Sequence, residues 1–244
     1  MNGESERNGS IVSKSPAKIA GMFDAIADRY DFLNHLLSAG LDRRWRTRAI
    51  RSLKLTGGER ILDLCTGTGD LAIAAVRAQP AARVVGVDFS GAILRVGEGK
   101  LKAARLDARV AMVQGDAARL PIANGSVDAV TIGFGIRNVE RIDIAATELH
   151  RVLKPGGRLA ILEFAVPTLP VFSPIYGWYV SRVLPQIGRA LSRNGSAYAY
   201  LPASIDAFAS PDEFVKILRQ AGLRTNSPIR LMLGSVILYT ARRD

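Results

Sequence analysis

Three aspartates, Asp63, Asp88 and Asp116, each come at or just after the end of a short run of β-branched and aliphatic residues. Such runs predict buried parallel strands. Because parallel strands end at the same edge of a sheet, the three carboxylates would gather at the crevice where α/β sheets bind nucleotide-like ligands. The alternative role for such an acid is to cap the N-terminus of the following helix.

The first of these strands leads directly into a turn that contains Gly67 and Gly69. Glycine lets the backbone turn sharply and lets a ligand lie against bare main chain. Residues 67–72 also fit the dinucleotide fingerprint, a weak match on its own. Asp63 and Asp70 would repel a pyrophosphate and attract an ammonium group. The turn therefore favours S-adenosylmethionine over a dinucleotide.

The other two acids fit the rest of such a cofactor. Asp88 is placed to accept hydrogen bonds from both ribose hydroxyls, and Asp116 could accept one from the adenine amino group. Three consecutive strands that each end in an aspartate are a stronger signal than any one of them.

Length and composition indicate one domain in a reducing compartment. The chain has 244 residues, of which 48% are hydrophobic, and no linker divides it. Residues 1–14 are predicted to be a disordered polar tail with no signal-peptide core, and 15–244 one domain. No uninterrupted apolar run reaches the ~18 residues of a membrane span. The single cysteine, Cys65, excludes an intrachain disulfide, and with two histidines no metal site is expected.

The net charge of +11 is concentrated most densely in residues 43–54. At helical spacing, Trp45, Ala49 and Leu53 share one face and the arginines occupy another. Such a helix could rest on an anionic bilayer or on nucleic acid, or it could be a solvated face over an ordinary core helix. No aromatic stacking platform accompanies it, so a lipid surface is favoured and no nucleic-acid partner is expected.

Later segments complete an α/β fold. We expect a class I methyltransferase (Rossmann-like) domain with a seven-stranded, mostly parallel sheet that ends in an antiparallel hairpin. A nicotinamide-binding sheet would more often continue in parallel. The segments are a strand at 127–134, a helix at 144–153 ended by Lys154-Pro155-Gly156-Gly157, a strand at 159–164, a helix from 211 to about 221, and strands at 225–231 and 234–241.

An insertion at 167–210 separates the fifth strand from the last helix. It holds four of the six tyrosines and one of the two tryptophans. Core packing would explain some of these aromatic residues. An aromatic, proline-rich insertion beside the strand ends also suits a lid over an apolar, ring-shaped acceptor.

Taken together, these segments resemble the ubiquinone/menaquinone biosynthesis C-methyltransferases over about residues 18–242. The turn at 63–70 (DLCTGTGD) is common to many methyltransferases. The more selective segments are 22–34 (MFDAIADRYDFLN), 133–139 (GFGIRNV), 148–157 (ELHRVLKPGG) and 198–205 (YAYLPASI).

The resemblance implies methyl transfer from S-adenosylmethionine to a ring carbon of a polyprenylated quinol, in menaquinone or ubiquinone synthesis or both. Carried over by position, the cofactor contacts fall on Thr68, Asp88, Asp116, Ala117 and Gly133.

Two departures from the family pattern stand out. The family turn often reads Ala-Gly-Gly or Cys-Cys-Gly where this chain has Cys65-Thr66-Gly67. The family often has serine at position 133, where glycine leaves only backbone groups.

The acceptor side would be served by Arg137 and Asn138, just past the fourth strand. Arg137 could hold a phenolate by charge-assisted hydrogen bonds, with Asn138 orienting the ring, because a guanidinium is a poor base. A salt bridge that closes the loop is the alternative role for Arg137. Tyr30, from an N-terminal helical cap at about 18–55, is a second candidate.

Two other functions would each use part of these features. A short-chain NAD(P) dehydrogenase would need a Tyr-x-x-x-Lys pair that is not found at such a site, and a non-catalytic membrane-surface protein would bind no cofactor. The expected partners are the quinol and an anionic membrane surface, with a homodimer as one oligomeric option. The expected location is the cytoplasm, at the inner face of the cell membrane.

Overall fold

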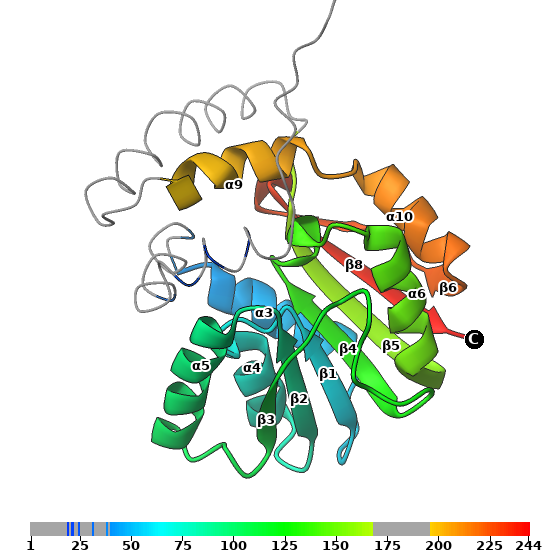
Figure 1. Cartoon of the computed structure of the whole chain (residues 1–244). Helices are drawn as coiled ribbons and strands as arrows, with labels where there is room; N and C mark the ends of the chain where they lie inside the picture. Colours follow the sequence, from blue (N-terminus) through cyan, green and yellow to red (C-terminus); the bar gives the residue numbers. More distant parts are fainter. Residues whose placement is uncertain are drawn as a thin grey trace, which may run out of the picture.

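Figure 1 shows the computed structural model, which describes residues 19, 21, 24, 31, 38, 40–167 and 196–244, with backbone alone at 196–199. The predicted tail 1–14 and Tyr30 lie outside the described residues. So do most of the lid insertion and, apart from isolated positions, the first half of the helical cap.

One sheet of eight strands organises the chain, in the order β3-β2-β1-β4-β5-β8-β6, with β7 also paired to β8 (Figure 1). Neighbouring strands from β3 to β5 are parallel, and β8 is antiparallel to β5. The predicted fold class is confirmed. The strands are β1 Arg60–Leu64, β2 Arg83–Asp88, β3 Val110–Gln114, β4 Val127–Gly133, β5 Leu153–Phe164, β6 Leu223–Thr225, β7 Ile229–Leu231 and β8 Val236–Arg243.

The strand predicted at 225–231 is two short strands instead. Both β6 and β7 pair antiparallel with β8, and because β5 occupies the other edge of β8, they share the seventh position of the sheet. Pro228, which has no N–H to donate, lies between them. After β6, Asn226 donates two hydrogen bonds to Thr240, from its backbone N–H to the carbonyl and from its side-chain amide to the hydroxyl.

The Lys-Pro-Gly-Gly segment follows the end of the helix, as predicted, but it belongs to a strand, and Lys154 does not lie in the last helical turn. Helix α6 ends at Val152, and β5 begins at the next residue. The segment lies within β5, where Gly156 has a φ of +75° and the pairing of β4 with β5 shifts register. Lys154 is held there by an ion pair with Asp128 (Nζ–Oδ1 2.6 Å).

Helices cover both faces of the sheet, and each face has its own core. Helices α3, α4 and α5 pack on one face around Ile61, Ala72 and Leu101, whereas α6 and α10 pack on the other around Leu62, Leu149 and Phe214. The helices are α3 Asp42–Ser52, α4 Asp70–Ala78, α5 Gly91–Ala103, the 3₁₀ turn η2 Ile136–Asn138, α6 Ile142–Val152, α9 Ser196–Asp206, α10 Pro211–Gln220 and the 3₁₀ turn η4 Met232–Gly234.

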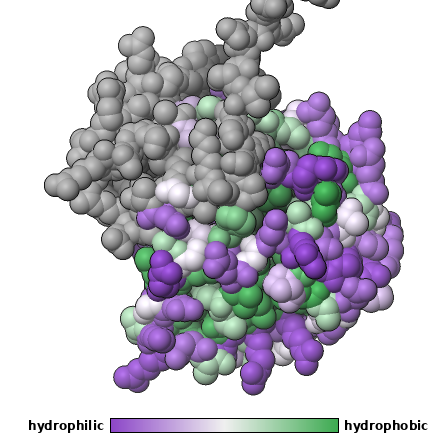
Figure 2. Space-filling model, in the orientation of Figure 1, coloured by the Kyte–Doolittle hydropathy of each residue, from purple (hydrophilic) through white to green (hydrophobic). Residues whose placement is uncertain are grey.

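The outer helices are amphipathic, with apolar side chains buried against the sheet and hydrophilic ones exposed to solvent. Helix α10 begins with a capping box between Ser210 and Glu213 and buries Phe214 and Leu218. Figure 2 shows hydrophilic side chains over most of the side where α6 and α10 lie. In α3, Trp45 and Ala49 face the core as predicted, with Leu53 beside them. Within the described part of the chain, no helix has the length and apolar character needed to cross a membrane.

Candidate functional site

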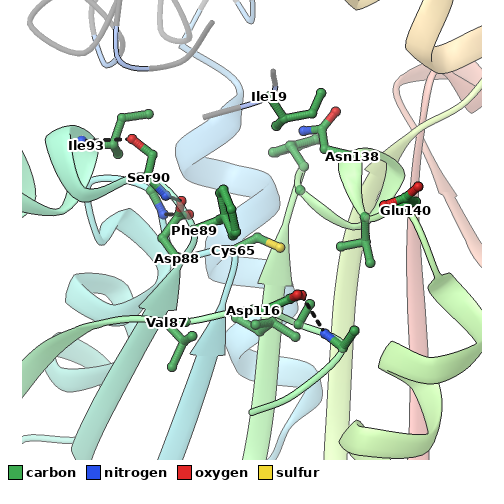
Figure 3. A pocket seen from close by; sticks show the side chains of 18 of the residues that line it. Ile19, Cys65, Val87, Asp88, Phe89, Ser90, Ile93, Asp116, Asn138 and Glu140 are labelled. Carbon is green, nitrogen blue, oxygen red and sulfur yellow. Dashed lines mark hydrogen bonds between the residues drawn. The ribbon is translucent and has the colours of Figure 1, made fainter. Parts of the chain in front are cut away.

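A pocket opens at the carboxyl edge of the parallel strands (Figure 3). Its walls come from the segments that follow β1, β2, β3 and β4, because the carboxyl ends of these neighbouring strands meet at this edge. The residues predicted from the sequence that line it are Gly67, Asp88, Asp116, Ala117, Gly133 and Asn138.

Asp88 ends β2 and faces this pocket (Figure 3). Its Oδ2 accepts a hydrogen bond from the Gly67 N–H (2.8 Å), and its Oδ1 accepts one from the Ser90 N–H (3.0 Å). Burial raises the pKa of this carboxyl above its usual range, while the backbone donors oppose that shift. Each carboxylate oxygen keeps capacity for a further donor, which suits a pair of ribose hydroxyls.

Asp116 follows β3 on the neighbouring side of the pocket. Its Oδ1 accepts a hydrogen bond from the Ala118 N–H (2.8 Å), which fixes a tight turn closed by the Arg119 N–H and the Asp116 carbonyl (3.0 Å). The turn places Ala117 against the pocket and leaves Asp116 Oδ2 available to a donor such as an amino group.

Asp63 does not line the pocket, although it too lies near a strand end. Its Oδ1 accepts a hydrogen bond from Thr131 (2.6 Å), its partner across the sheet, and its Oδ2 accepts one from Thr66 (2.5 Å). A bond from the Ala72 N–H, in the first turn of α4, also reaches it. For this acid the structure therefore matches the helix-capping alternative.

Thr68, Gly69 and Asp70 also lie outside the pocket lining. Asp70 forms ion pairs with Lys100 and Arg46, so the carboxylate expected to attract an ammonium group is balanced by two cations. The Thr68 hydroxyl donates to Asp31, which itself pairs with Lys100 (2.6 Å). These contacts hold the glycine turn against α3 and α5.

On the acceptor side, Asn138 lines the pocket and Arg137 does not. The Asn138 Oδ1 accepts a hydrogen bond from the Tyr200 hydroxyl of α9 (3.1 Å). Arg137 is 6% exposed and forms an ion pair with Glu163 (Nη1–Oε1 2.9 Å). The salt bridge that closes the loop, the alternative role for Arg137, is therefore present.

Several lining residues were not singled out in the sequence. Phe89 and Ile93, together with Ala118 and Val139, give the pocket apolar walls between its carboxylates. Phe89 directly follows Asp88, so its place beside a predicted ligand contact was the signal that could have identified it. Ile19, near the N-terminus, also lines the pocket (Figure 3).

The pocket fits a nucleoside-bearing cofactor. Two carboxylates from adjacent strands are separated by apolar walls, an arrangement that matches hydroxyl and amino groups on either side of a flat ring. At Gly133, a Cβ would lie 2.7 Å from the Cδ1 atom of Leu71, so the Leu71 side chain takes the space that a serine there would need.

Known proteins place the chain unambiguously. A family model described as the ubiE/COQ5 methyltransferase family matches residues 11–243. The chain belongs to this family. A ubiquinone/menaquinone biosynthesis C-methyltransferase UbiE from Syntrophotalea carbinolica is 48% identical over 91% of this chain and 93% of that protein. A demethylmenaquinone methyltransferase from Thermus thermophilus is 46% identical over 91% of this chain and all of that protein.

A solved structure shows the shared fold. A SAM dependent methyltransferase from Aquifex aeolicus superposes with a TM-score of 0.62 at 17% identity, over 94% of this chain and 99% of that one. Membership of the ubiE/COQ5 family confirms the predicted enzyme class, its cofactor S-adenosylmethionine and its place in quinone biosynthesis. It gives the dehydrogenase and non-catalytic alternatives no support.

Asp63 makes the stability of this ubiE/COQ5 family member depend on pH. Burial raises its pKa from 3.8 to about 6. As pH rises from 4 to 6, the unfolded chain loses this proton first, so unfolding becomes easier by about 3 kcal/mol in total. We expect an Asp63→Asn variant to gain stability relative to the wild type across this window, as measured by urea unfolding at pH 4 to 7.

Asp128→Asn is the matched control for that experiment. The pKa of Asp128 is lowered, chiefly by its bonds with Lys154 and the Arg60 N–H, which outweigh its burial. Its contribution has the opposite sign: it is present above the ordinary pKa and is lost as pH falls. Unfolding free energies of Asp63→Asn and the wild type that run parallel with pH would contradict the prediction.

Proposed function

We propose that this chain transfers the methyl group of S-adenosylmethionine to a ring carbon of a polyprenylated quinol, as in the conversion of demethylmenaquinol to menaquinol or the matching ubiquinone step. The proposal depends on one observation: a single pocket is lined both by Asp88 and Asp116, which follow from β2 and β3, and by Asn138, which comes after β4. The names of the two curated relatives support the same substrate class.

Cofactor residues are assigned by their position in the pocket. Asp88 would accept from the ribose hydroxyls, Asp116 and Ala117 would meet the adenine, and Gly67 and Gly133 would offer backbone. Asp63, Thr68 and Gly69 are proposed to act by shaping the turn, because their contacts lie within it or behind it. When bound, S-adenosylmethionine supplies an electrophilic methyl group.

On the acceptor side, the protein must hold an electron-rich ring against that methyl group and favour its phenolate. Asn138 is the candidate with a described place in the pocket, and its amide group can donate to the ring oxygen because Oδ1 already accepts from Tyr200. Tyr30 is proposed as a second residue on the acceptor side.

The test is transfer of label from methyl-labelled S-adenosylmethionine to demethylated prenyl quinols. We expect carbon-methylated product from a menaquinol precursor, a ubiquinol precursor or both, and inhibition by S-adenosylhomocysteine. Absence of labelled product with every prenylated quinol tried would overturn the proposal. Quinone extraction from a strain lacking the protein would identify the pathway.

We further propose that α3 contacts an anionic membrane surface, where a long-tailed quinol resides. The helix exposes Arg43, Arg44, Arg48 and Arg51, whereas Trp45 is buried. Arg43 and Arg51 also face a groove together with Arg77 of α4. Basic side chains gain about 1 kcal/mol each near such a surface, an attraction that salt screens.

Neutralising three of these residues tests the membrane proposal. An Arg44→Gln/Arg48→Gln/Arg51→Gln variant should bind anionic vesicles roughly 100-fold more weakly in flotation assays at low salt. The exposed residues Lys102, Lys216 and Arg224, changed to glutamine together, give a control with the same net charge and little effect. Binding that ignores salt and lipid charge would contradict the proposal.

A further inference from the structure

A buried ion pair lies directly behind the acceptor side of the pocket. Glu163, near the end of β5, has no exposed surface, and Arg137 of η2 is 6% exposed. Their side chains meet at 2.9 Å. Charges this deep are tolerated when they are paired and hydrogen-bonded, so removing either partner would leave an uncompensated buried charge.

Glu163 binds the backbone of the loop as well as the guanidinium. Its Oε2 accepts a hydrogen bond from the Arg137 N–H (3.2 Å), and its Oε1 accepts another from the Phe164 N–H (2.9 Å). One carboxylate therefore fixes both the main chain and the side chain of Arg137 against β5.

The guanidinium of Arg137 is engaged away from the pocket. It donates to the Phe134 carbonyl and, through Nε, to the Ser204 hydroxyl of α9 (3.2 Å), and it lies 5.5 Å from the ring centroid of Phe164. Phe134 lines the pocket, and α9 lies within the insertion at 167–210. Arg137 thus ties the loop after β4 to both β5 and α9.

Asn138 is the next residue, and its side chain does reach the pocket (Figure 3). Tyr200, one turn before Ser204 on α9, donates to its Oδ1. The ion pair fixes the backbone on one side of Asn138, and Tyr200 fixes its side chain. Both therefore determine where the Asn138 amide points.

We propose that Glu163 is a positioning residue for the methyl transfer and that Arg137 acts with it on the loop, without contacting the quinol. The pair holds Asn138 at the orientation in which its amide meets the ring oxygen. The competing role is the one expected from the sequence, in which Arg137 itself holds the phenolate. This inference depends on the proposed methyl transfer to a quinol.

The mildest test is Glu163→Gln, which keeps the shape of the side chain and removes its charge. If Glu163 positions the loop, kcat should fall about tenfold across the whole pH range, with the affinity for S-adenosylhomocysteine changed less than threefold. If Arg137 holds the phenolate, release from Glu163 should strengthen that contact, and a KM for the quinol below that of the wild type would overturn the proposal.

A double-mutant cycle adds an independent readout. Arg137→Met leaves Glu163 without its partner, whereas Arg137→Met/Glu163→Met removes both charges. Because both side chains act on the loop as one unit, the kcat of the double variant should lie within about threefold of that of Arg137→Met. A double variant that is folded, by thermal unfolding, and whose loss of kcat is the product of the losses in Arg137→Met and Glu163→Met would also overturn the proposal.

Two controls separate the causes. Asp128→Asn removes a carboxylate from the ion pair with Lys154 near the amino end of β4, at the opposite edge of the sheet from the pocket, and should leave kcat unchanged. Tyr200→Phe removes the other contact to Asn138 and should lower kcat in the same direction as Glu163→Gln. Wild-type protein inactive on every prenylated quinol would overturn the proposed function itself, whereas active wild type with unaltered Glu163→Gln overturns only the positioning role.

Discussion

An Asp88→Ala variant should bind S-adenosylmethionine at least about 100-fold more weakly than the wild-type chain. The carboxylate is placed to accept from two ribose hydroxyls, and each hydrogen bond to a charged group contributes about 1.5 kcal/mol or more. Losing two such bonds costs about 3 kcal/mol, and each 1.4 kcal/mol is a tenfold change in affinity.

The same change alters the turn itself. Asp88 accepts the N–H groups of Gly67 and Ser90, which would then face the pocket without a protein partner. Asp88→Asn should lose less affinity than Asp88→Ala, because its amide oxygen still accepts hydrogen bonds. It should still bind more weakly than the wild type, because the NH₂ group faces one of the backbone N–H donors.

Calorimetric titration with S-adenosylhomocysteine measures both variants, with thermal unfolding as a check on folding. Asp128→Asn is the control, since that carboxylate lies near the amino end of β4, remote from the pocket, and should leave the affinity unchanged. An Asp88→Ala protein with wild-type affinity would show that the ribose binds elsewhere.

Strand positions and the acids at their ends could be predicted from the sequence, but the direction of each side chain could not. Asp88 and Asp116 line the pocket as expected. Asp63 comes one residue before the end of β1, between Leu62 and Leu64, which point into the core on the other face of the sheet. Alternation along the strand turns Asp63 toward α4 and Thr131 instead of the pocket.

The task of Arg137 was harder to foresee because it depends on Glu163, 26 residues later in the chain. A signal was present: an acid inside the apolar strand 159–164 requires a buried partner. Choosing that partner among many arginines requires knowing that β4 and β5 are neighbours and in which register. The division of the predicted strand 225–231 into β6 and β7 also had a signal in the sequence. Pro228 has no N–H group to donate to a neighbouring strand.

A Gly135→Ala variant should be clearly less stable than the wild type, because Gly135 packs against Cys65. Both residues line the pocket, and a Cβ added at Gly135 would lie 2.3 Å from the Cβ of Cys65. Neither atom can rotate away, because each is fixed to the main chain. Gly135→Ala must therefore push the turns after β1 and β4 apart, at a cost of about 1–3 kcal/mol of stability and with a weakened cofactor pocket.

Cys65→Gly should rescue that variant. Cys65 has a φ of +53°, a conformation that glycine adopts without strain, so the single change should be close to neutral. The double variant removes the obstructing Cβ and should regain most of the unfolding free energy and the S-adenosylhomocysteine affinity. Gly99→Ala in α5, where an added Cβ meets open space, controls for the methyl group itself. A double variant as unstable as Gly135→Ala would show that the contact with Cys65 is not what requires glycine at position 135.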